Sequence, residues 1–141
     1  IRADLWHDEV ELRECLERAL ACADVVKISV EELAFLTGNA QVHEGLAALM
    51  RTCPARLVLV TQGKEGVTAW QKGALTHYPA SPVECIDTTG AGDAFVAGLL
   101  FGLARDGQAR LSEVITLAQR CGALATTAKG AMTALPYHHE L

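Results

Sequence analysis

Strand-like segments alternate with helix-period segments along this chain, and this alternation limits its fold more than any other feature. Segment 57–61 has the length and β-branched content of a buried strand, whereas 8–22 repeats its apolar residues at helical spacing. Such alternation requires crossover connections, so the strands become parallel and helices cover both faces of the sheet. The pattern predicts the α/β class with a doubly wound, mainly parallel sheet. Expected strands lie at 25–28, 57–61, 67–70, 74–78 and 83–86, and expected helices at 8–22, 30–37, 43–52, 94–105 and 112–127, the last capped by Ser112.

Composition narrows the class of protein. The 141 residues include 12 Lys and Arg against 17 Asp and Glu, a formal net charge of −5, which excludes a nucleic-acid module driven by positive charge. No stretch approaches the roughly 18 apolar residues of a membrane span. The five cysteines include no Cys-x-x-Cys pair, which argues against a zinc knuckle. We therefore expect a cytoplasmic protein without nucleic-acid or membrane partners, and residues 1–141 as one domain or part of one.

Three polar positions near the first expected strand have both a structural and a functional interpretation. Ser29 and Glu32 form the Ser-x-x-Glu pattern of a capping box, which would stabilise the start of the next helix. Lys27 lies within the apolar strand, so its side chain either reaches solvent or contacts a phosphate. The sequence leaves both interpretations open.

A glycine-rich run at 87–93, Asp-Thr-Thr-Gly-Ala-Gly-Asp, follows an expected strand and precedes an expected helix. Gly90 and Gly92 allow the backbone to approach a ligand, and the first N–H groups of a helix have no partner within it. A helix N-terminus carries roughly half a positive charge, so its dipole and its N–H groups together favour a phosphate. Asp93 either caps this helix or faces the bound anion. The run therefore predicts an anion site.

Two common phosphate-binding motifs are excluded by inspection. A Walker A loop needs Gly-Lys followed by Ser or Thr, but Gly63 and Lys64 are followed by Glu65. A dinucleotide fingerprint needs a third glycine where Phe95 stands, which argues against an NAD-dependent dehydrogenase. The phosphate site belongs to another class.

The whole chain resembles the ribokinase-like, or PfkB, family of carbohydrate kinases. Run 87–93, followed by Ala-Phe-Val-Ala-Gly-Leu-Leu, is similar to the second signature of that family, which is long and specific. Segments 27–38 and 60–67 agree with the family in order and spacing. Segment 121–136 is similar to the fructokinase branch and, within it, to aminoimidazole riboside kinase. The resemblance implies a three-layer α-β-α fold and covers about the C-terminal half of such an enzyme.

This resemblance implies phosphoryl transfer from ATP to a sugar hydroxyl. Asp93 matches the general base that takes the proton of the attacking hydroxyl. Phosphoryl transfer has a loose transition state, so a weakly basic carboxylate is sufficient for this role. Gly90, Ala91 and Gly92 match an anion hole whose backbone N–H groups stabilise the transferring phosphoryl group. The nucleotide would lie against Thr61, Gly63 and Gly66, with Lys27 and Ser29 as further phosphate contacts.

Two kinds of cation are also implied by the resemblance. Mg²⁺ on the nucleotide phosphates would be positioned by Glu32, while Ser29 stands where the wider family has Asn in its Asn-x-x-Glu pattern. K⁺ would lie beside the anion hole, held by Asp87 and the carbonyl of Thr89. Further carbonyl oxygens would come from Ala125, Ala128 and Gly130.

The function implied by the resemblance is an ATP-dependent kinase acting on a hydroxymethyl group of fructose or a related furanose or riboside. Residues 1–141 would be the C-terminal nucleotide-binding portion of a single sugar-kinase domain. The sugar-binding and lid residues would lie outside it, so this piece alone would be inactive. The full-length protein would bind ATP and a small sugar, with a homodimer as a further option. The rival interpretation is a non-catalytic nucleotide-binding module.

Overall fold

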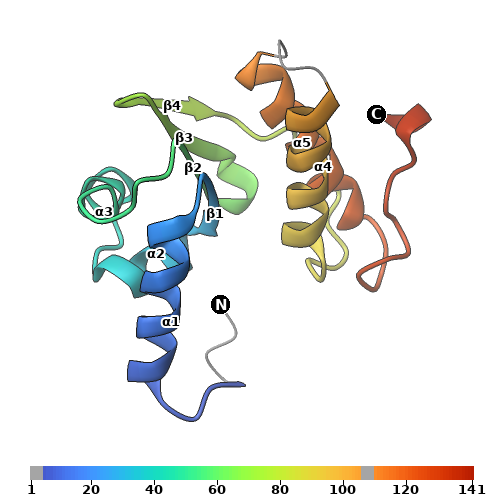
Figure 1. Cartoon of the computed structure of the whole chain (residues 1–141). Coiled ribbons are helices and arrows are strands. Elements are labelled where there is room, and N and C mark those ends of the chain that lie inside the picture. The colour runs from blue at the N-terminus through green and yellow to red at the C-terminus, as the bar shows by residue number, and fades with distance from the viewer. Residues whose placement is uncertain (1–4, 106–109) are drawn as a thin grey trace. The chain divides into compact units, whose positions relative to one another are not determined.

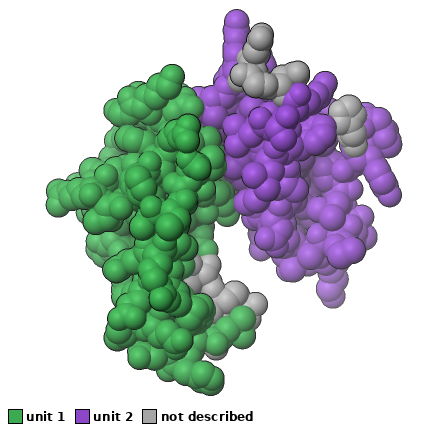
Figure 2. Space-filling view, in the orientation of Figure 1, with its two compact units in different colours: residues 1–62, 67–77 green, residues 63–66, 78–141 purple. Residues whose placement is uncertain are grey.

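A computed structural model describes residues 5–105 and 110–141, which fall into two compact units (Figure 1; Figure 2). Unit 1, green in Figure 2, extends to residue 62 and includes 67–77, and unit 2 comprises 63–66 and 78–141. The elements in chain order are α1 (Glu9–Cys22), β1 (Val25–Ser29), α2 (Val30–Thr37), α3 (Val42–Leu49), β2 (Leu57–Thr61), a 3₁₀ turn (Gly63–Glu65), β3 (Val67–Gln71), β4 (Ala74–Tyr78), α4 (Ala91–Arg105), α5 (Leu111–Ala125) and a second 3₁₀ turn (His138–Glu140).

The four strands form one mixed sheet in the order β1-β2-β3-β4. β1 and β2 are parallel, with Ser29 opposite Thr61, whereas β2 and β3 are antiparallel. Residues 62–66 alone join β2 to β3, and a parallel return needs about a dozen residues or more. The α/β class is confirmed. The expectation of a mainly parallel sheet is wrong for these strands, because so short a connection permits only a hairpin.

The parallel pair supplies the core of unit 1. Val26 and Ile28 of β1 alternate along their strand, as do Val58 and Val60 of β2, so each pair lies on a single face. β2 is buried throughout 57–60, a continuous apolar run typical of an internal strand. The other buried members of this core are Leu33, Leu46, Leu49, Cys53 and Ala55.

The start of α2 agrees with the structural interpretation of its first residues. Ser29 Oγ accepts a hydrogen bond from Glu32 N at 3.2 Å, and Glu32 Oε2 accepts one from Ser29 N at 2.8 Å. The two bonds complete the predicted capping box and satisfy N–H groups that have no partner within the helix. Gly38 then ends α2 in the left-handed region, with φ of 70°.

Two antiparallel helices, α4 and α5, form the core of unit 2. Gly102 of α4 lies against Val114 of α5, and Gly122 of α5 lies against the carbonyl of Ala91. The first turn of α4 therefore packs beside the C-terminal half of α5. Within the two described ranges, no helix is both long enough and apolar enough to cross a membrane.

Two local expectations in unit 2 are wrong. Segment 83–86 forms no strand; its last residue, Ile86, instead donates its N–H to Thr126 O at 2.8 Å. Ser112 does not cap α5, because that helix begins at Leu111 and the residue at the cap position, Arg110, makes no side-chain hydrogen bond. In the first case the backbone of Ile86 bonds to a segment distant in the sequence, and in the second a residue type that often caps helices lies inside the helix.

Candidate active site

The glycine-rich run leads into α4 through a left-handed residue. Gly90 has φ of 80°, and a Cβ there would lie 2.9 Å from the backbone of Ala131, so only glycine fits without strain. The Gly90 carbonyl accepts the hydrogen bond of Ala94 N at 2.9 Å. The helix therefore starts at Ala91, earlier than the expected residue 94.

Two of the three predicted anion-hole residues keep a free backbone N–H. Ala91 N donates to Thr88 O at 3.2 Å, whereas the N–H groups of Gly90 and Gly92 have no acceptor in the described part of the chain. The same is true of the N–H of Asp93. Because a helix N-terminus attracts anions, the N–H groups of Gly90, Gly92 and Asp93 can bind one. The N–H of Ala91 is already bonded to Thr88 O and is not such a donor.

Asp93 lies in the first turn of α4, with an exposed side chain. The alternative role of an N-cap is wrong, because the helix has already begun at Ala91. Among the residues that the structure describes, none donates a hydrogen bond to the Asp93 carboxylate or pairs with its charge. This carboxylate is thus available to accept a proton from a group bound beside the N–H donors.

The Asp87 carboxylate joins two loops of unit 2. Asp87 Oδ1 accepts hydrogen bonds from Thr89 N at 2.9 Å and Thr89 Oγ1 at 2.7 Å. Asp87 Oδ2 accepts one from Gly130 N at 2.8 Å. The Gly130 N–H, followed by the Thr89 hydroxyl and N–H, holds the pKa of Asp87 below its ordinary value of 3.8. Asp87, Thr89 and Gly130, all predicted to surround K⁺, are therefore brought together.

The donor set around Asp87 fits a hard monovalent cation. A carboxylate offers about four lone-pair positions, and three are used by Thr89 and Gly130, so one remains for a ligand. Carbonyl oxygens of the neighbouring loop are of the type that such cations prefer. Ala125 is the last residue of α5, and Ala128 follows it in that loop. Gly130 faces Asp87 with its N–H, so only its carbonyl remains for a cation.

The predicted nucleotide turn, 61–66, contains two glycines with different surroundings. Gly63 has φ of 57°, and nothing lies within 4 Å of the position of a Cβ. Gly66 has φ of 106°, and a Cβ there would lie 2.8 Å from Ala80 N and would collide with Tyr78 O. Gly63 therefore has open space beside it, whereas Gly66 is required by packing against 78–80.

The ends of β1 and β2 bring Ser29 and Thr61 side by side as partners in the parallel pair. The Thr61 hydroxyl donates to Ile28 O at 3.3 Å, so its lone pairs remain for a ligand. The Ser29 hydroxyl accepts from Glu32 N and lowers the pKa of Glu31 through a hydrogen bond. Ser29 is therefore occupied by the capping of α2.

Two further predicted residues lie in unit 1. Lys27 is half-buried at the centre of β1, opposite Leu59. Glu32 lies in the first turn of α2, where Oε2 accepts from Ser29 N at 2.8 Å. The capping role of Glu32 is thus present, and its role with Mg²⁺ stays a prediction.

Sequence reasoning missed a buried hydroxyl beside the predicted nucleotide turn. Thr68 is 5% exposed, and its Oγ1 donates to Gln62 Oε1 at 2.7 Å. It also lies 3.2 Å from His77 Nδ1 on β4. Thr68 therefore holds the residue that precedes Gly63. A Thr in an apolar strand carries no signal of such a role, because the partners come from other segments.

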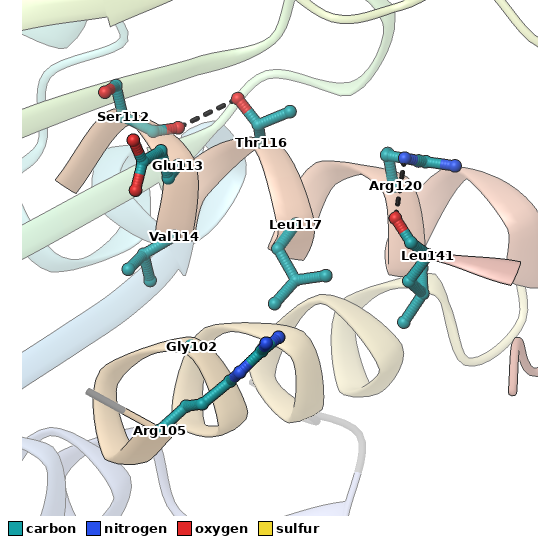
Figure 3. A pocket seen from close by; sticks show the side chains of 9 residues that line it. All are labelled: Gly102, Arg105, Ser112, Glu113, Val114, Thr116, Leu117, Arg120 and Leu141. Carbon is teal, nitrogen blue, oxygen red and sulfur yellow. Dashed lines mark hydrogen bonds between the residues drawn. The ribbon is translucent and has the colours of Figure 1, made fainter. Parts of the chain in front are cut away.

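A concavity of about 510 Å³ lies elsewhere in unit 2, between the end of α4 and the first turns of α5 (Figure 3). Its lining includes Arg105, Thr116 and Arg120, and the Arg120 guanidinium donates to Leu141 O at 2.8 Å. The Thr116 hydroxyl bonds to Ser112 O within its own helix. None of the predicted site residues lines this concavity, so it is not the candidate site.

Comparison with known proteins agrees with these local features. The model of the pfkB family of carbohydrate kinases matches residues 1–137. The chain is 58% identical over 145 residues to fructokinase from Klebsiella pneumoniae, covering 100% of this chain and 47% of the relative. A double mutant of fructokinase from Vibrio cholerae O395, in its fructose, ADP and potassium ion bound form, matches with a TM-score of 0.91 and 43% identity over 99% of this chain and 46% of that one.

A second solved structure is similar. Aminoimidazole riboside kinase from Salmonella enterica, complexed with aminoimidazole riboside and an ATP analog, has a TM-score of 0.90 and 38% identity, over 99% of this chain and 48% of that one. This chain therefore belongs to the pfkB family of carbohydrate kinases, and the predicted resemblance to its fructokinase branch is confirmed. The chain spans about half the length of the relatives it matches.

Acidification is expected to weaken the Asp87 connection. A carboxyl whose pKa is lowered by folding adds stability above its unfolded pKa, and this stability is lost as pH falls through the lower, folded value. The urea midpoint should therefore fall more steeply in the native protein than in Asp87→Asn as the pH is lowered through and below 3.8, the ordinary pKa of this carboxyl. Glu84→Gln, which removes an exposed carboxylate from the preceding segment, is the matched control and should keep the native slope. Equal slopes for all three proteins would show that Asp87 does not join the loops.

Proposed function

We propose that the full-length protein is an ATP-dependent sugar kinase that transfers the γ-phosphoryl group to a hydroxymethyl group of fructose or a related furanose or riboside. The observation that carries this proposal is the exposed Asp93 carboxylate at the start of α4, beside N–H groups that have no acceptor among the described residues, in a chain of a carbohydrate kinase family. The fructokinases and the riboside kinase that it resembles support a sugar or riboside as the acceptor.

In the proposed reaction Asp93 takes the proton of the sugar hydroxyl as the hydroxyl oxygen bonds to the γ-phosphorus. The bond from that phosphorus to the β–γ bridging oxygen breaks, and ADP leaves with the electron pair. Charge on the transferring phosphoryl group is stabilised by the free N–H groups of Gly90 and Gly92 and by the N-terminus of α4. Positioning of the two reactants supplies much of the remaining rate enhancement.

We assign the nucleotide phosphates and ribose to the turn containing Thr61, Gly63 and Gly66. The open space beside Gly63 supports this assignment, and the lone pairs of Thr61 can accept a hydrogen bond from a ribose hydroxyl. Lys27 would supply positive charge toward the phosphates. Ser29 would act through the capping of α2, because its hydroxyl is already engaged.

Two cations complete the proposal. Mg²⁺ would be positioned through water by Glu32 and would neutralise charge on the nucleotide phosphates. K⁺ would be held by the Asp87 carboxylate, the Thr89 carbonyl and carbonyls of Ala125, Ala128 and Gly130. The potassium ion bound to the Vibrio fructokinase supports a monovalent site in this family.

The wider assignment follows from the family. Residues 1–141 would form the nucleotide-binding portion of a single kinase domain with three α-β-α layers and a doubly wound sheet. The sugar would be held by residues outside this chain. We further propose that the full-length protein acts in the cytoplasm, with a homodimer as one option for its assembly.

A sugar panel tests the proposed function. The full-length protein should form ADP from ATP in the presence of fructose, ribose or aminoimidazole riboside, with at least one acceptor far above the background without sugar. Residues 1–141 alone should show no turnover, because only the side of the phosphoryl donor is present. Calorimetric binding of ADP without turnover of any acceptor would favour the rival non-catalytic module.

Substitution of the general base should reduce turnover and spare binding. Asp93→Asn in the full-length protein should lower kcat by about 10²–10⁴-fold while the dissociation constant for ADP stays close to the native value. Asp24→Asn, an exposed acid that pairs with Arg56 at 2.9 Å, is the control and should leave kcat unchanged. Near-native turnover by Asp93→Asn would refute its assignment as the base.

Exchange of Na⁺ for K⁺ at constant ionic strength should raise activity. The reason is that a site made mostly of carbonyl oxygens suits the larger ion, and the Asp87 carboxylate keeps one position for it. Asp87→Ala should lose this preference. An enzyme indifferent to the exchange, or a variant that keeps the preference, would contradict the K⁺ site.

The two roles of Glu32 can be separated by a pair of variants. Glu32→Gln keeps the capping box, because Gln also completes it, but should raise the Mg²⁺ concentration needed for half-maximal turnover. Ser29→Ala removes the cap and should lower the free energy of unfolding by about 0.5–2 kcal/mol without changing the Mg²⁺ requirement. If Glu32→Gln has the native Mg²⁺ dependence, Glu32 is a capping residue only.

A further inference from the structure

One side chain of α5 crosses to the end of β4, and no sequence pattern singles it out. Gln119 Nε2 donates to Tyr78 O at 3.1 Å and to Pro79 O at 3.3 Å. The side-chain amide has two hydrogens, so it can satisfy both carbonyls at once. Gln119 is half-buried, on a helix whose neighbours Ala118 and Cys121 are buried in unit 2. The chain at 78–79 is therefore attached to a rigid element.

The same stretch of backbone supports the nucleotide turn. Gly66 lies so close to 78–80 that a Cβ would stand 2.8 Å from Ala80 N and 2.9 Å from the carbonyl carbon of Pro79. Gly66 N also donates to Gly63 O at 3.1 Å, which closes the turn on itself. A shift of residues 78–80 would therefore move Gly66, and with it the backbone of the whole turn.

We propose that Gln119 is a positioning residue for the nucleotide: it holds Tyr78 and Pro79 in place, and they in turn set the position of the Gly63–Gly66 turn. This inference rests on the proposed function, in which that turn binds ATP. Without the two N–H donors, each of the two carbonyls loses a hydrogen bond and the backbone beside Gly66 is less firmly held. Loss of these bonds is expected to weaken nucleotide binding, and to leave sugar binding and proton transfer to Asp93 unchanged.

Two variants of the full-length protein test this role. Gln119→Glu keeps the shape of the side chain but has no N–H donor, and Gln119→Leu removes all its hydrogen bonds. Both should raise KM for ATP by about three- to tenfold, with KM for the sugar and kcat close to native values. Thr116→Val, one turn earlier on α5, is the matched control: it removes a hydrogen bond to Ser112 O that stays within the helix. It should leave KM for ATP unchanged.

The substrate comparison distinguishes positioning from direct contact. Because the turn would bind the phosphates and ribose of any nucleotide, the variants should raise KM for ATP and for GTP by the same factor. A changed ratio between ATP and GTP would mean that Gln119 touches the base, and would overturn the inference. The inference would also be overturned if Gln119→Glu and Gln119→Leu had the same KM for ATP as Thr116→Val.

Hydrogen exchange on the native protein gives a test that needs no variant. Addition of ADP should slow exchange in both 63–66 and 78–80, since the two stretches move as one unit. Slower exchange in 63–66 alone would overturn the inference even if the nucleotide binds as proposed. A native protein that neither binds ADP nor turns over ATP would refute the proposed function, and the role of Gln119 with it.

Discussion

Three hydrogen bonds to the Asp87 carboxylate hold together the loops from which the candidate site is built. Two come from Thr89, in the same loop, and one from Gly130, 43 residues later in the chain. The backbone N–H of Asp87 adds a hydrogen bond to Thr126 O, so both its side chain and its main chain bond to the segment at and after the end of α5. The entry to α4, and hence the position of its free N–H groups, depends on this connection.

The candidate anion site combines a requirement of folding with one of function. A fold is most stable when its backbone N–H groups are hydrogen-bonded, yet an anion hole must keep some of them without a protein partner. The structure meets both needs at the start of α4, where Ala91 N is bonded and the N–H groups of Gly90 and Gly92 find no acceptor within residues 5–105 and 110–141. The left-handed conformation of Gly90 permits this arrangement, because it turns the chain into the helix against the backbone of Ala131.

Local patterns predicted those parts of the fold whose interactions are local. The capping box of Ser29 and Glu32 was predictable because both partners lie within one helical turn. The strand expected at 83–86 was not formed, because Ile86 finds its acceptor at Thr126, about a third of the chain away. The start of α5 was misplaced because Ser is a frequent cap residue, whereas this helix begins at Leu111 after Arg110, which makes no side-chain cap hydrogen bond.

The sequence by itself determined the family, the position of the acidic residue at the start of α4 and the glycines of both turns. It could do so because these features reside in short runs, where residue type sets backbone conformation directly. Only the tertiary structure decided which N–H groups remain free, that both Asp87 oxygens are used within the protein, and that Gly66 and Gln119 meet the same carbonyl of Tyr78. Each of these depends on segments that approach one another from distant parts of the chain, and no local pattern records which segments will meet.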